Sequence, residues 1–186
     1  MASSLAIPRL MRIGAGASLH LPETLRALGA SKPLLVTDSF MSKTGAMRPV
    51  QAALDAAEVE HAVFDGAVPD PTTQSLEGGI DAAHRHGSDV VVGFGGGSAM
   101  DSAKAIAMLA VHGMDGTPLH RFKVPVEAPR GLPIVCIPTT AGTGSEVTKV
   151  SIVIDSDSGE KMLIAGAGLL PDAALVDYEV RAATCP

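Results

Sequence analysis

The sequence has 186 residues, a length that fits one globular domain with a sizeable core. Apolar residues make up 46% and aromatic residues only 3%, so the core must be built from aliphatic side chains, as in helices packed on a parallel sheet. The formal net charge of −6 argues against nucleic acid and anionic membranes as partners, and no apolar stretch is long enough for a membrane span.

Apolar runs alternate with segments of helical periodicity along the chain. Residues 34–37 predict a buried strand, and residues 40–57 carry apolar side chains at helical spacing. This alternation predicts a parallel sheet with crossover helices. Its further predicted elements are strands at 60–64, 89–93 and 132–137 and helices at 73–86 and 98–110.

The pattern changes after Thr148. Residues 150–154 and 161–164 are two strand-like runs, and the polar connector 155–159 between them ends in glycine. Such a connector is typical of a β-hairpin. A last short strand is predicted at 173–176.

We expect residues 1–186 to form one domain. We interpret the segment 112–130, which contains prolines and charges, as a surface excursion. The two cysteines, Cys136 and Cys185, make neither a disulfide framework nor a metal-binding pattern. Free thiols and a cytoplasmic location are therefore expected.

A glycine-rich segment, residues 93–97, joins the strand 89–93 to the helix 98–110. Glycines allow close backbone approach, and the start of a helix offers N–H groups and a positive dipole end to a phosphate. We expect Ser98 to cap this helix and Asp101 to complete a capping box. A pyrophosphate site is favoured over a tight turn without a ligand, because four glycines in five positions exceed what a turn needs. The spacing matches neither the G-x-G-x-x-G fingerprint nor a Walker loop.

A second motif, residues 138–148, follows the strand 132–137 and reads Pro-Thr-Thr-Ala-Gly-Thr-Gly-Ser-Glu-Val-Thr. Its hydroxyls, glycines and backbone N–H groups suit a polar concave loop. Ligands of open α/β sheets gather at the carboxyl ends of strands, so this loop and the glycine-rich segment could face one crevice. A helix-capping role, with Thr143 or Ser145 as cap and Glu146 in the first turn, does not exclude ligand contact.

Asp38 follows the strand predicted at 34–37. A carboxylate at this place can accept hydrogen bonds from both ribose hydroxyls of an adenosine, and it would repel a 2′-phosphate. It therefore favours NAD, with NADP disfavoured. The alternative, in which Asp38 is the N-cap of the following helix, is equally compatible with the sequence.

Together these motifs resemble one family, the iron-containing (group III) alcohol dehydrogenases, in their N-terminal half. The similarity is carried by Gly95-Gly96-Gly97-Ser98-x-x-Asp101 and Pro138-Thr139-Thr140-Ala141-Gly142-Thr143-x-x-Glu146-x-Thr148. Three shorter segments agree with it: Val36-Thr37-Asp38, Pro69-Asp70-Pro71-Thr72 and Leu170-Pro171-Asp172. The resemblance extends from about residue 8 to the end of the chain.

The resemblance implies an α/β fold: a Rossmann-like parallel sheet flanked by helices, with a β-hairpin near the C-terminus, as in dehydroquinate synthase-like N-terminal domains. It implies that residues 1–186 bind NAD(P), and that Fe2+ or Zn2+ is held by Asp and His residues of a helical C-terminal domain. We expect this second domain to be absent from the chain. The whole enzyme would transfer hydride between NAD(H) and a small alcohol or aldehyde, and the resemblance leaves a homo-oligomer open.

Carried over residue by residue, the resemblance implies the following cofactor-binding positions. Asp38 would contact the adenosine ribose and Lys161 a ribose hydroxyl, and Asp70 stands where many relatives carry Asn. The pyrophosphate region would lie at Gly95, Gly96, Gly97, Ser98 and Asp101, and the crevice would be lined by Thr139, Thr140, Thr143 and Thr148. No catalytic residue is assigned, and none of the six histidines is expected to bind a metal.

Two other functions are compatible with a nucleotide-binding α/β domain. One alternative is a stand-alone nucleotide-binding module without redox activity. In either case we expect this chain to be inactive as an enzyme by itself. An ATP-binding phosphotransferase is disfavoured, because no acidic residue interrupts Gly95-Gly96-Gly97.

Overall fold

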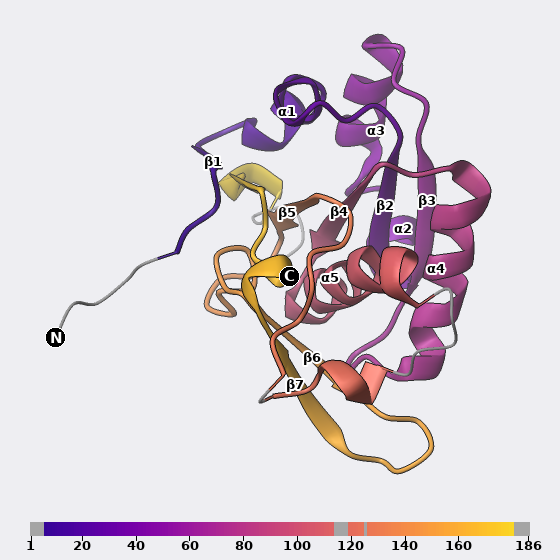
Figure 1. The fold of residues 1–186 in the computed structure, drawn as a ribbon. Coiled ribbons are helices and arrows are strands. Elements are labelled where there is room, and N and C mark those ends of the chain that lie inside the picture. The colour runs from indigo at the N-terminus through magenta and orange to yellow at the C-terminus, as the bar shows by residue number, and fades with distance from the viewer. Residues whose placement is uncertain (1–5, 114–118, 125, 181–186) are drawn as a thin grey trace, which may run out of the picture.

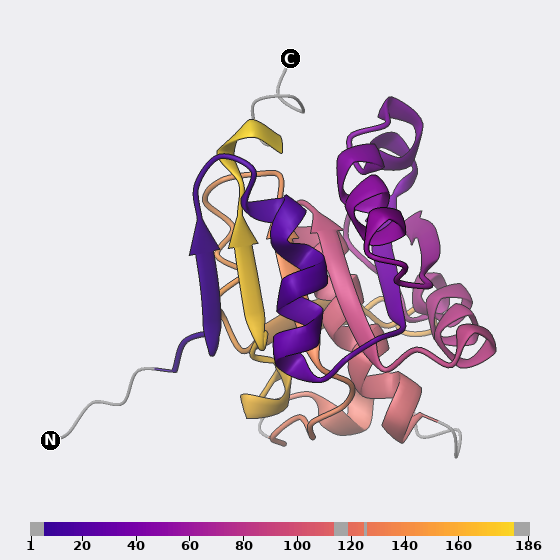
Figure 2. The same cartoon turned by 90° about the horizontal axis from the view of Figure 1, so that it is seen from above.

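The computed structural model describes residues 6–113, 119–124 and 126–180. Its main sheet has six strands in the order β1-β8-β5-β4-β2-β3, and every neighbouring pair is parallel. Figure 2 shows β1 and β8 side by side at one edge. The predicted α/β fold with a parallel sheet is confirmed. The strands are β1 (Leu10–Ile13), β2 (Pro33–Asp38), β3 (Ala62–Ala67), β4 (Val90–Gly95), β5 (Ile134–Pro138) and β8 (Ala173–Val176).

Helices cover both faces of this sheet. α1 (Leu21–Leu28) and α3 (Arg48–Ala56) pack with Leu35 and Val92, whereas α4 (Thr73–His86) and α5 (Gly97–His112) pack with Leu34 and Val91. Figure 1 shows α4 and α5 lying together on their face. Because both faces are covered, β4 is buried along its whole length. Within the described residues, no helix is long and apolar enough to cross a membrane.

Two elements near the N-terminus were not predicted, and one predicted helix is divided. β1 is a short edge strand whose side chains are mostly exposed, so it lacks the apolar run that marks a buried strand. α1 is only eight residues long. The helix predicted at 40–57 is two helices, α2 (Ser39–Thr44) and α3, because Gly45 adopts a left-handed conformation with φ 76° and ends α2.

The predicted hairpin is confirmed. β6 (Val150–Ile154) and β7 (Lys161–Ala165) pair antiparallel, and Gly159 in the connector has a φ of 73°. The hairpin packs against α5 and projects beyond the sheet in Figure 1. The described residues also form three short 3-10 helices: η1 (Ala17–His20), η2 (Leu119–Phe122) and η3 (Ala167–Leu169).

The expected surface excursion at 112–130 is wrong for part of its length. Leu119 and Ala128 are buried in the core on the α5 side. Just after the segment, the backbone N–H of Leu132 donates to the carbonyl of Ala107 at 2.9 Å. Leu119 and Ala128 therefore belong to the core cluster that also includes residues of α5, and residues 114–118 and 125 lie outside the described residues.

Candidate functional site

The chain reverses its direction across the sheet between β2 and β4. From β2 it runs through α2 and α3 to the edge strand β3, then returns through α4 to β4 on the other side of β2. α3 and α4 lie on opposite faces of the sheet. At such a switch point, the carboxyl ends of the two strands flank the crevice in which open α/β sheets bind ligands.

A cleft of about 510 Å³ lies at these strand ends. Asp38 from β2, residues 96–99 at the start of α5, and Thr140 after β5 all line it. Most of these residues were predicted from the sequence, but the rest of the cleft wall, residues 39–41 and 67–69, was not. A cleft of this volume is in the range of small-molecule sites.

The N-terminus of α5 opens into this cleft without a capping side chain. Its N-cap is Gly96, which has no side chain to cap the helix, so the predictions that Ser98 caps it and that Asp101 completes a capping box are wrong. The helix starts before Ser98, which therefore lies in its first turn. By contrast, Asp38 caps α2 and Thr72 caps α4. The positive end of the longest of these helices thus faces the cleft unblocked by a cap.

The glycine-rich and threonine-rich loops meet at the cleft. A Cβ atom placed on Gly96 would lie 3.3 Å from Thr140 Oγ1, and one on Gly97 would lie 3.2 Å from Thr143 Cγ2. The two loops are also joined below the cleft, where the backbone N–H of Thr139 donates to the carbonyl of Gly95 at 2.9 Å. The expectation that both loops face one crevice is confirmed.

The two carboxylate oxygens of Asp38 have different surroundings. Oδ1 accepts hydrogen bonds from the backbone N–H groups of Phe40 and Met41, each at 2.9 Å, which confirms the N-cap interpretation. Oδ2 points toward the glycine-rich turn, 3.8 Å from where a Cβ atom on Gly95 would lie. The cap therefore uses one oxygen and leaves the other beside the cleft.

Asp101 and Thr148 are held toward the hairpin. Asp101 accepts hydrogen bonds from Ser145 Oγ at 3.2 Å and from the backbone N–H of Ile152 at 3.1 Å, and burial raises the pKa of its carboxyl. The carbonyl of Thr148 accepts from Lys104 Nζ at 2.7 Å. Lys104 is fully buried, and burial lowers the pKa of its ammonium. Lys104 was not predicted as a site residue, because a lysine on a helix normally marks the exposed face.

Asp70 and Lys161 form an ion pair of their own. Lys161 Nζ donates to Asp70 Oδ1 at 2.9 Å, and both side chains are exposed. Asp70 has a φ of 50°, the left-handed conformation that non-glycine residues rarely adopt. The pair connects the loop after β3 to β7, and neither residue is among those that line the 510 Å³ cleft.

Comparison with known proteins places the chain in a family. The family model for iron-containing alcohol dehydrogenase matches residues 8–178. The chain belongs to the iron-containing alcohol dehydrogenase family. It is 36% identical over 177 residues to the NAD-dependent methanol dehydrogenase of Bacillus methanolicus, an alignment that covers 94% of this chain and 45% of that protein.

Two solved structures of the family share the fold. The crystal structure of 1,3-propanediol oxidoreductase superposes with a TM-score of 0.90 at 31% identity, covering 97% of this chain and 47% of that one. The sulfoacetaldehyde reductase of Bifidobacterium kashiwanohense, in complex with NAD+, gives a TM-score of 0.84 at 31% identity with the same coverage. The chain thus spans a little under half the length of these relatives. The relatives are named as dehydrogenases, oxidoreductases and reductases, which does not favour the alternative of a stand-alone module.

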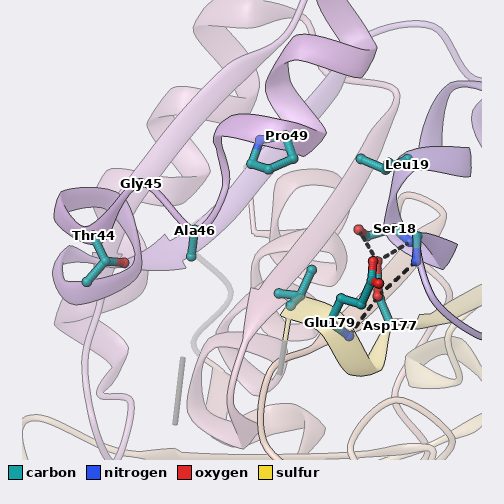
Figure 3. A pocket seen from close by; sticks show the side chains of 10 residues that line it. Ser18, Leu19, Thr44, Gly45, Ala46, Pro49, Asp177 and Glu179 are labelled. Atoms are coloured by element: carbon teal, nitrogen blue, oxygen red, sulfur yellow. Dashed lines mark hydrogen bonds between the residues drawn. The ribbon is translucent and has the colours of Figure 1, made fainter. Parts of the chain in front are cut away.

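A second cavity, of about 340 Å³, lies between η1, the end of α2 and the residues after β8 (Figure 3). Its buried carboxylate, Asp177, accepts from Ser18 Oγ at 2.6 Å and from the backbone N–H groups of Ser18, Gly16 and Glu179. Burial acts to raise the pKa of Asp177, but these hydrogen bonds outweigh it and the net pKa is lowered. Asp177 thus ties the end of β8 to the turn after β1.

The residues of the described part of the chain do not form an iron site. Among them, no three His, Cys, Asp or Glu side chains gather into a group that could hold a metal ion. Burial raises the pKa of the Cys136 thiol to about 12, so this side chain stays protonated. Cys185 and the side chain of His120 lie outside the described residues.

Proposed function

We propose that this chain is the NAD-binding half of a metal-dependent alcohol dehydrogenase or aldehyde reductase. One observation carries the proposal: the N-terminus of α5, without a capping side chain, opens into a cleft that Asp38 and Thr140 also line. Backbone N–H groups and the positive end of a helix suit a pyrophosphate. The NAD-dependent relative and the relative solved with NAD+ support the choice of ligand.

In this proposal, the pyrophosphate lies over Gly95, Gly96 and Gly97 and accepts hydrogen bonds from the first turn of α5, including Ser98. The glycines fit this task, because a side chain on Gly96 would stand between the helix and Thr140. Thr139, Thr140, Thr143 and Thr148 border the cofactor from the second loop. Of these, Thr140 and Thr143 have exposed side chains at the point where the loops meet.

The adenosine end would lie toward β2 and β3. In this proposal, Asp38 Oδ2 accepts hydrogen bonds from ribose hydroxyls, and its charge disfavours the 2′-phosphate of NADP. Its position beside the glycine-rich turn supports this role. Phe40, Val68 and Pro69 line the same cleft, and Phe40 is 59% exposed. An exposed aromatic ring beside apolar side chains provides a surface for a purine.

Asp70 and Lys161 are proposed to act together at the cofactor. Their ion pair holds the Lys161 ammonium at the loop after β3, on the side of the proposed adenosine wall. We propose that Lys161 donates to a ribose hydroxyl while it stays paired with Asp70.

When bound, NAD supplies the carbon that accepts or releases hydride. We propose that residues 1–186 form one NAD(P)-binding domain, and that a further helical domain holds the Fe2+ or Zn2+ which polarises the alcohol oxygen. A small alcohol or aldehyde would be the substrate, in a cytoplasmic enzyme that is not bound to membrane or nucleic acid. The acidic composition and the buried free thiol of Cys136 support this location.

The test is a binding titration of the purified chain with NADH, NADPH and ATP, followed by an assay of alcohol oxidation with added Fe2+ or Zn2+. We expect saturable NADH binding, weaker NADPH and ATP binding, and no turnover by this chain alone. Thr24→Ala, which removes a hydrogen bond from α1 to the carbonyl of His20 and changes a residue that is not among those lining the cleft, should bind NADH normally. Tighter binding of ATP than of NADH would point to a phosphotransferase, and absence of NADH binding would overturn the proposal.

A further inference from the structure

Lys104 occupies an unusual place for a lysine. It lies in the second turn of α5 and is fully buried. Its Nζ donates to the carbonyl of Thr148 at 2.7 Å and to the carbonyl of Val150 at 2.8 Å. These carbonyls belong to the end of the threonine-rich loop and the first residue of β6. A buried ammonium is unfavourable unless such acceptors compensate it.

Asp101, one turn before Lys104, binds the same segment from the same helix. Its carboxylate accepts from Ser145 Oγ and from the backbone N–H of Ile152, and its carbonyl accepts from Ser151 Oγ at 2.9 Å. Residues 145–152 are thus attached to α5 at both ends and in the middle. We call Asp101, Lys104 and these contacts the α5 brace.

The brace lies directly behind the proposed phosphate site. Ser145 Oγ, which Asp101 holds, would lie 3.5 Å from a Cβ atom on Gly97 in the first turn of α5. Cγ2 of Thr143, two residues before Ser145, would lie 3.2 Å from the same added Cβ atom. A shift of residues 145–152 would therefore move the threonines relative to the N–H groups of α5.

We propose that Lys104 is a positioning residue for the nucleotide site: through the carbonyls of Thr148 and Val150 it sets the distance between the threonine-rich loop and the N-terminus of α5. This inference rests on the proposed function for its ligand, but its structural part does not need a nucleotide. Asp101 has the same role in the brace, and both its carboxylate oxygens are engaged with the hairpin side of the loop. A packing role alone would be served by a methionine of similar length.

Lys104→Met tests the proposal, because it keeps most of the side-chain volume and removes the donor. Leu54→Ala is the matched control: Leu54 is equally buried, but it lies in α3 on the opposite face of the sheet. Hydrogen–deuterium exchange of the chain without nucleotide is measured first, and the NADH dissociation constant second. We expect Lys104→Met to exchange at least tenfold faster at residues 143–152 and to bind NADH about tenfold more weakly. We expect Leu54→Ala to lower the unfolding temperature without either change.

The two measurements separate the two claims. Wild-type chain that fails to bind NADH overturns the proposed function, while the exchange data still decide whether Lys104 holds the loop. Unchanged exchange at 143–152 in folded Lys104→Met, or equal NADH loss in Leu54→Ala, overturns the positioning role. If Lys104→Met does not fold, Ser145→Ala removes the hydrogen bond to Asp101 and leaves Lys104 and its two contacts in place. Faster exchange at 143–148 and weaker NADH binding in that variant support the brace, and wild-type behaviour in both overturns it.

Discussion

The variant Gly96→Ala tests whether Gly96 is needed for ligand binding or only for the turn before α5. Gly96 has φ −77° and ψ −173°, a conformation open to any residue, so the added methyl group causes no backbone strain. Its nearest neighbour would be Thr140 Oγ1 at 3.3 Å, on an exposed side chain that can rotate. The free energy of unfolding should therefore change by less than about 1 kcal/mol.

Nucleotide binding should respond far more strongly to this methyl group. It stands where a pyrophosphate would approach the N-terminus of α5, and a hydrogen bond to a charged group contributes about 1.5–3 kcal/mol. The loss of one such bond corresponds to a weakening of roughly 10- to 100-fold in the NADH dissociation constant. Gly96→Val, with a larger side chain, should weaken binding further.

The assay is a fluorescence titration with NADH, paired with thermal unfolding of the same samples. Gly78→Ala is the control, since Gly78 lies in α4 and an added Cβ atom would have the Phe64 ring as its nearest neighbour, with Cε2 at 3.1 Å. The added methyl group affects the packing against Phe64 and should leave the NADH dissociation constant unchanged. Wild-type NADH affinity in folded Gly96→Ala would refute the reasoning, because the glycines would then serve only the turn.

Three further variants are predicted. Asp38→Gly should lower the free energy of unfolding by only a few tenths of a kcal/mol, because glycine is a tolerated N-cap. It should also raise the NADH dissociation constant and reduce the preference for NADH over NADPH. An unchanged preference in competition titrations would show that Asp38 is not part of the site. Asp177→Asn should lower the free energy of unfolding at pH 7 by about 2 kcal/mol. Because the Asp177 pKa is lowered from 3.8, its contribution is present above that pH and is lost as pH falls through the lower folded-state pKa. Urea melts should thus converge with wild type below pH 3.8, and a constant difference would contradict the assignment. Asp70→Asn should change stability by less than about 1 kcal/mol, because its ion pair with Lys161 is exposed; a larger loss in thermal unfolding would show that the pair is needed for the fold.

The sheet could be predicted from the sequence where strands are buried on both faces. β4 and β5 are continuous apolar runs, and β2 is nearly so, which is why their positions were found. β1 could not be found in the same way, because its Leu-Met-Arg-Ile sequence pairs on one edge only and leaves three of four residues exposed.

The outline of the site was predictable, but the contacts behind it were not. Glycines and threonines at strand ends mark a crevice by local pattern alone. The cap of α5 was misplaced because Ser98 satisfies the usual sequence preference, although the helix begins at Gly97 with Gly96 as its N-cap. Asp101 and Lys104 find their partners 44 to 51 residues away in the sequence, and no local rule reveals such contacts.

The most direct test of the account is a crystal structure of the chain with NAD+. We expect the diphosphate oxygens within hydrogen-bond distance of the backbone N–H groups of Gly97 and Ser98, with the adenosine ribose beside Asp38. A diphosphate found elsewhere, such as the cavity beside Asp177, would contradict the assignment of the site to the N-terminus of α5.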